Sequence, residues 1–102
     1  MSALLTLQQF APLIHQRFLI EVDEHNAFDV ELIEVSALPC HPMQGGAVPA
    51  REPFSLIFRG PGAFYVPQRL YAFQNETLGR HELFMVPIGP DEVGHRYQVI
   101  FN

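Results

Sequence analysis

Lysine and tryptophan are absent from the sequence, and cysteine occurs only once, at Cys40. A single cysteine excludes an intramolecular disulfide, so nothing in the sequence indicates an oxidising compartment. The six basic residues are all arginines, and eleven acidic residues outnumber them, which gives a formal net charge of −5 at pH 7. Because surfaces that bind nucleic acids carry an excess of basic residues, we expect no nucleic-acid partner.

Long hydrophobic runs are missing as well. No stretch approaches the roughly 20 apolar residues that a membrane-spanning helix needs. The first ten residues have neither the basic segment nor the apolar core of a secretory signal. These absences predict a soluble, cytoplasmic protein without a membrane partner.

The residues that are abundant indicate one globular domain. The chain has 102 residues, of which 48% are hydrophobic, and nine phenylalanines and three tyrosines supply most of the bulk. A chain of this length and composition can bury a stable core without disulfides or metals. We therefore expect residues 1–102 to form a single β-barrel-like domain.

Hydrophobic alternation predicts six strands after one short helix. Thr6 and Gln9 form a weak capping box before a helix of about residues 7–13, which Pro12 keeps short. Apolar residues then alternate with polar ones, and a change of phase at residues 33–35 predicts a β-bulge or a bend. The strands are expected near residues 18–22, 28–35, 51–59, 68–73, 81–88 and 96–101.

Short connections favour antiparallel pairing, because parallel strands need long crossovers. The predicted fold is therefore mainly β: a small antiparallel six-stranded barrel or bent sandwich with one short N-terminal helix. Turns are expected at Asp23–Asn26 and at Gly89–Gly94, where Asp91 should accept hydrogen bonds from the turn backbone. We expect Phe84 and Tyr97 to lie in the core and Gly89 to have a positive φ angle.

Two longer strings resemble a known family. They are Arg51-Glu-Pro-Phe-Ser-Leu-Ile-Phe-Arg-Gly-Pro61 and Leu78-Gly-x-x-Glu-Leu-Phe-x-Val-Pro-Ile-Gly-Pro-Asp91. Leu5-Thr-Leu-x-x-Phe-Ala-Pro12 and Tyr97-x-x-x-Phe-Asn102 fit the same pattern. The chain is similar to a family of stand-alone bacterial domains of unknown function, about a hundred residues long. The resemblance implies no reaction and no catalytic residues, and it suggests an accessory or assembly role, with a link to phage-tail-like proteins.

The first fifty residues hold one arginine and six acidic residues. Four of these acidic residues, Asp23, Glu24, Asp29 and Glu31, belong to the hairpin that the first two strands are expected to form. The simplest interpretation is a solvated acidic face. The alternative is an electrostatic docking surface for a basic partner.

The segment from Pro39 to Pro49 is predicted to be the longest loop, and it contains Cys40 and His41. It is either a plain proline-rich loop with an incidental thiol or part of a soft-metal or small-molecule site. Such a site would add Met43 and a distant His81 or His95. Because only one close pair of ligands is present, we expect no metal and no cofactor.

Two further clusters each allow two interpretations. Phe64 and Tyr65 follow a Gly-Pro-Gly turn, so they form either an exposed interface or a plug at one end of the barrel. Asp91, Glu92 and His95 invite an acid-base interpretation, but the turn alone explains Asp91. We therefore expect no enzymatic activity.

The preferred functional hypothesis is a protein-interaction or structural module that binds a protein partner or itself. Its possible interaction surface comprises Asp23, Glu24, Asp29, Glu31, Cys40, His41, Phe64 and Tyr65. The alternative is a small-molecule or metal-binding barrel that uses the loop of residues 39–49.

Overall fold

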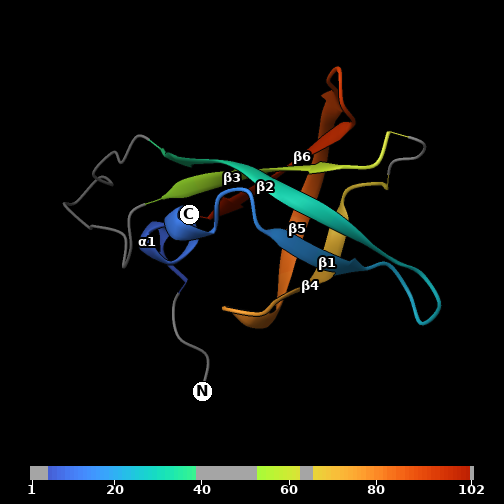
Figure 1. The fold of residues 1–102 in the computed structure, drawn as a ribbon, viewed down its shortest axis with the longest axis horizontal. Helices are drawn as coiled ribbons and strands as arrows, with labels where there is room; N and C mark the ends of the chain where they lie inside the picture. The colour runs from blue at the N-terminus through green and yellow to red at the C-terminus, as the bar shows by residue number, and fades with distance from the viewer. Residues whose placement is uncertain (1–4, 39–52, 63–65, 102) are drawn as a thin grey trace, which may run out of the picture.

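The computed structural model describes residues 5–38, 53–62 and 66–101 (Figure 1). The chain begins with a short helix, α1 (Leu7–Phe10), which continues directly into a 3-10 turn, η1 (Ala11–Leu13). Six strands follow: β1 (Arg17–Glu21), β2 (Ala27–Ala37), β3 (Phe54–Gly60), β4 (Arg69–Asn75), β5 (Gly79–Pro90) and β6 (His95–Phe101). The short helix and the six strands confirm the elements that the sequence predicts.

The six strands close into an antiparallel barrel with the order β1-β2-β3-β6-β5-β4, and β4 pairs back onto β1. The barrel consists of two three-stranded meanders, β1–β3 and β4–β6. One seam between them pairs β3 with β6, where Phe54 lies opposite Phe101. The other pairs β1 with β4, where Leu19 lies opposite Gln74. The predicted antiparallel barrel is therefore confirmed, and the bent sandwich is not formed.

The interior of the barrel is filled with side chains that alternate along the strands. In β1, Phe18 and Ile20 are buried while Arg17 and Leu19 face outward. The ring of Phe58 lies 5.2 Å from the rings of both Phe18 and Phe73. Rings packed at these distances contribute beyond the area that they bury. A filled interior makes the barrel a packed core, not a container for a ligand.

The N-terminal helix covers one end of the barrel (Figure 1). The Thr6 backbone N–H donates to Gln9 Oε1 at 2.8 Å, which satisfies a donor that the helix leaves unpaired. Phe10 is buried, and its ring lies 5.6 Å from that of Phe101 and 5.8 Å from that of Phe54. The α-helix ends where the 3-10 turn that contains Pro12 begins, and the two together bring Phe10 and Leu13 onto the core at this end of the barrel.

Two bulges bend the long strands. The register of β2 against β3 shifts between Leu32 and Glu34, as the change of phase in the sequence predicts. The register of β5 against β6 shifts between Pro87 and Gly89. Gly89 has a φ of 105°, which side chains with a Cβ adopt only under strain. The expected positive φ at Gly89 is therefore confirmed.

Of the two aromatic residues that were expected in the core, one is placed correctly. Tyr97 is fully buried, but the expectation for Phe84 is wrong, because half of its surface is exposed. The neighbours Leu83 and Met85 point into the barrel. Since successive side chains of a strand point to opposite faces, Phe84 must point outward.

In the part of the chain that the structure describes, no helix has the length and apolar character that crossing a lipid bilayer requires.

Candidate functional site

The β1–β2 turn explains the first predicted site residue, Asp23, in structural terms. Asp23 Oδ1 accepts hydrogen bonds from the backbone N–H groups of His25 and Asn26, at 2.8 and 2.9 Å. The Asn26 side-chain amide donates to both carboxylate oxygens, at 3.0 and 2.9 Å. The Asn26 side chain and then the His25 backbone lower the pKa of Asp23 below its usual value. The charge of Asp23 therefore holds the turn together, while the neighbouring Glu24 is exposed.

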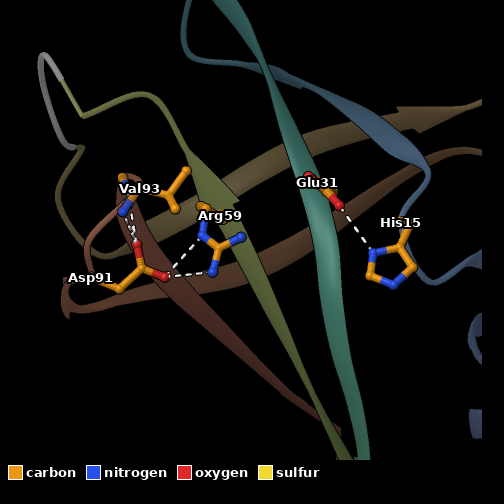
Figure 2. A network of polar contacts seen from close by, with 6 residues as sticks. His15, Glu31, Arg59, Asp91 and Val93 are labelled. Carbon is orange, nitrogen blue, oxygen red and sulfur yellow. Dashed lines mark hydrogen bonds and ion pairs between the residues drawn. The ribbon is translucent and has the colours of Figure 1, made fainter.

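The outer face of β2 carries Asp29 and Glu31, as predicted. His15 Nδ1 lies 3.0 Å from Glu31 Oε2 (Figure 2), and an Arg17 guanidinium nitrogen lies 4.0 Å from Asp29 Oδ2. Both pairs are well exposed, so water screens them and each contributes little to stability. The Arg17 guanidinium and the His15 ring thus lie against the acidic face. Its role as a docking surface stays a prediction.

The other predicted surface residues, Cys40, His41, Phe64 and Tyr65, lie outside the described residues, as does Met43. The next residue, Val66, is described: it is buried, and its backbone N–H donates to the Tyr97 hydroxyl at 3.2 Å. Val66 therefore belongs to the core of the barrel.

The two histidines that could serve as distant metal ligands, His81 and His95, lie far apart on the sheet. His81 is near the start of β5, where its Nε2 lies 2.8 Å from the Leu78 carbonyl oxygen. His95 pairs with Pro90 at the other end of β5. Within the described ranges, no group of three or more His, Cys, Asp or Glu side chains has the arrangement of a metal site.

Asp91 organises the β5–β6 turn and ties it to β3 (Figure 2). Its Oδ1 accepts the backbone N–H groups of Val93 and Gly94, both at 2.8 Å. Its Oδ2 accepts Nε and a terminal nitrogen of Arg59, at 2.8 and 2.6 Å. The Arg59 guanidinium, followed by the two backbone donors, holds the pKa of Asp91 far below its usual range. The predicted turn role of Asp91 is confirmed, and the carboxylate is fully engaged in it.

A polar hollow of about 810 Å³ lies on the outside of the barrel, where the β4–β5 turn approaches β1. Arg17, Leu19, Asn75 and Arg80 are among its lining residues. Arg80 is paired with Glu21 at 3.1 Å, and Asn75 donates to the Arg17 carbonyl oxygen at 3.2 Å. Arg80 and Asn75 are thus held by other groups of the barrel, and among the described lining residues no set of converging groups points to a particular ligand.

The most distinctive surface feature is a row of large apolar side chains on the outer face of β4, β5 and β6. Leu70, Phe84 and Ile100 are 52%, 50% and 51% exposed. Leu70 is paired with Phe84 across β4 and β5. Ile100 lies on β6, the other neighbour of β5, and the described pairs of these two strands run from Pro90–His95 to Val86–Gln98, two residues before Phe84 and Ile100. These three residues are called the apolar row below.

The sequence does contain a signal for the apolar row, and it lies in a part of β5 where apolar and polar residues do not alternate. Leu83, Phe84, Met85 and Val86 form an uninterrupted apolar run within β5. A strand with one buried and one solvated face should alternate, so a continuous run means that both faces are apolar. In a barrel with a filled interior, the second apolar face must be the outer one.

These features define a class of protein: a small, closed, six-stranded antiparallel barrel with a packed interior and an apolar outer face. The sequence model of a family described as a domain of unknown function (DUF6916) matches residues 5–101. The chain belongs to this family, which agrees with the resemblance to small domains of unknown function. Neither the curated proteins nor the solved structures that were compared with the chain gave a match.

Proposed function

We propose that the protein catalyses no reaction and acts as a structural or accessory module that binds another protein through the apolar row. The observation that supports this proposal is the position of Leu70, Phe84 and Ile100, half exposed on three neighbouring strands, with Leu70 directly opposite Phe84. Together they present roughly 300 Å² of apolar surface, which is the lower end of the size of the largest apolar patch on a typical monomer, a patch that is often functional.

The closure of the barrel determines how a partner can bind. Each of the six described strands pairs with a neighbour on both sides over part of its length, so the barrel has no whole free strand edge to which a partner strand would add. The proposed partner packs onto an outer face, where large apolar side chains supply most of the binding energy once water is excluded. An accessory role in an assembly, including the phage-tail-like assemblies suggested by the resemblance, requires a contact of this kind.

Site-specific photo-crosslinking in cells of the source organism tests the proposal. A photoreactive amino acid replaces Phe84 in one variant and Val93 in a matched control. Val93 is also apolar and is 71% exposed, but it lies on the β5–β6 turn, away from the apolar row. We expect one discrete crosslinked product from position 84 and none from position 93. Equal products from both positions, or no product from position 84, would contradict the proposal.

A further inference from the structure

We infer that the partner of the apolar row contributes an extended peptide segment, which pairs with β5 as an additional strand. This inference rests on the proposed function and specifies the kind of partner. It depends on a part of β5 where main-chain groups have no neighbouring strand, and on the side chains beside that part.

The barrel is split between β5 and β6 over part of their length. The two strands are paired near their shared turn, and the last of these pairs joins Val86 to Gln98. The rest of β5, Gly79–Met85, is paired with β4 on one side and, in the described part of the chain, with no strand on the other. Figure 1 shows the two strands running apart beyond their turn. One edge of β5 is therefore free next to the apolar row.

Pro87 indicates which main-chain groups face the split. It lies opposite Tyr97, and because proline has no N–H, it fits a pair of residues that exchanges no hydrogen bonds. Antiparallel strands alternate between pairs that exchange hydrogen bonds and pairs that do not. The next pair, Val86 with Gln98, is therefore of the hydrogen-bonded kind, and the main-chain groups of Val86 point toward β6.

The same alternation continues along β5, because Gly79–Met85 pairs with β4 without a register shift. In steps of two, the N–H and C=O groups of Phe84, Glu82 and Arg80 also point toward β6. No β6 residue is paired with them, and they form no other backbone hydrogen bond within the described ranges. All three residues are exposed, so a partner can reach this row of alternating donors and acceptors.

A row of free main-chain groups selects another extended backbone. A partner segment in the β conformation accepts from the N–H groups and donates to the C=O groups at the same spacing, which is how peptides add to exposed sheet edges. A helix cannot do this, because its own main-chain groups are already bonded to one another. The occupant that fits the split is therefore an extended segment of the partner.

The side chains beside the split specify the sequence of this segment. Phe84 and Glu82 lie on the same outer face of β5, two residues apart. Glu82 is exposed and forms no ion pair with a described residue. Residues that lie opposite each other on paired strands interact, so the segment should place a large apolar residue beside Phe84 and a basic residue beside Glu82. These two residues are then two positions apart in the partner, whichever direction it runs.

Amide hydrogen exchange of the wild-type chain, followed by NMR, tests the split without a ligand. We expect fast exchange at Arg80, Glu82 and Phe84. The amides of His81 and Leu83 face β4 and should exchange at least a hundredfold more slowly. Similar rates at all five positions would mean that the expected free donors are already bonded, which would overturn the inference.

A random library of ten-residue peptides, displayed on yeast and selected on the immobilised chain, tests binding. We expect the enriched peptides to carry lysine or arginine two positions from a large apolar residue. They should bind Glu82→Pro at least tenfold more weakly than Glu82→Val. Both substitutions remove the carboxylate, but only proline removes the N–H that faces the split. Because this N–H has no strand partner in the chain alone, both variants should fold, which circular dichroism checks.

Three results would overturn the inference: no enriched peptide, equal binding to Glu82→Pro and Glu82→Val, or loss of the fold in Glu82→Pro alone. The photo-crosslinked product from position 84 separates this inference from the proposed function. A product that forms equally in the Glu82→Pro and Glu82→Val chains supports binding through the apolar row but refutes pairing with β5. The absence of a product in the wild-type chain refutes the proposed function itself.

Discussion

Phe58 and Phe84 lie on opposite faces of the sheet, so the same substitution, phenylalanine to alanine, can be compared inside and outside the barrel. Phe58 is fully buried against Phe18 and Phe73, whereas Phe84 is half exposed. Phe58→Ala removes a ring from a packed core and leaves a cavity, which costs about 3–5 kcal/mol of unfolding free energy. Phe84→Ala loses only part of the burial of a ring and leaves no enclosed cavity, so we expect a loss of about 1 kcal/mol.

Urea unfolding followed by circular dichroism measures both losses, with tyrosine fluorescence as a second probe. The slope of free energy against urea should be unchanged in both variants if only the native packing has changed. Because Phe58→Ala removes a large share of the stability of a domain of this size, Phe58→Leu serves as a milder core variant. Equal losses for Phe58→Ala and Phe84→Ala would refute the assignment of Phe84 to the outer face.

Three further changes test the turns and the core. Tyr97→Phe removes the acceptor of the Val66 N–H in the interior and should cost about 1–3 kcal/mol in urea unfolding; an unchanged stability would mean that this bond contributes nothing. Gly89→Ala, at a φ of 105° and with no atom within 4 Å of the new Cβ, should cost about 1–3 kcal/mol through backbone strain alone, and an unchanged melting temperature would argue against that φ. The lowered pKa of Asp91 means that its stabilising effect is present above about pH 4 and is lost as the pH falls below that value, because the unfolded chain binds the proton first. Asp91→Asn should therefore lose less stability upon acidification than the wild type, and parallel pH profiles of melting temperature would contradict this role.

Local features of the fold were predictable because neighbouring residues determine them. Asp23 and Asn26 form a turn that needs only their own side chains and backbone, and Asp91 does the same in the β5–β6 turn. The bulge near Glu34 is visible as a change of phase in the sequence. The candidate acidic residues Asp29 and Glu31 lie on the outer face of β2 for the same reason, since alternation alone sets their direction.

Features that depend on distant pairing were not predictable in detail. The pairings of β3 with β6 and of β1 with β4 join parts of the chain that are far apart in sequence, and no turn residue specifies them. The outward position of Phe84 follows from these pairings and from the filled interior. Within the run Leu83–Val86, alternation alone allows either set of side chains to face the core, so the apolar row could be identified only in the closed barrel.

The two-meander construction of the barrel has a consequence for how the chain folds. Each meander can form from contacts within one half of the chain, but the seams β3–β6 and β1–β4 close loops of about half its length, which costs entropy before any contact compensates for it. Closure should therefore be the slow step, and a half-formed barrel exposes two strand edges that match the edges of the other half. At high concentration during refolding, one chain can supply its β4–β6 half to the β1–β3 half of another, giving a domain-swapped dimer with the same strand pairs.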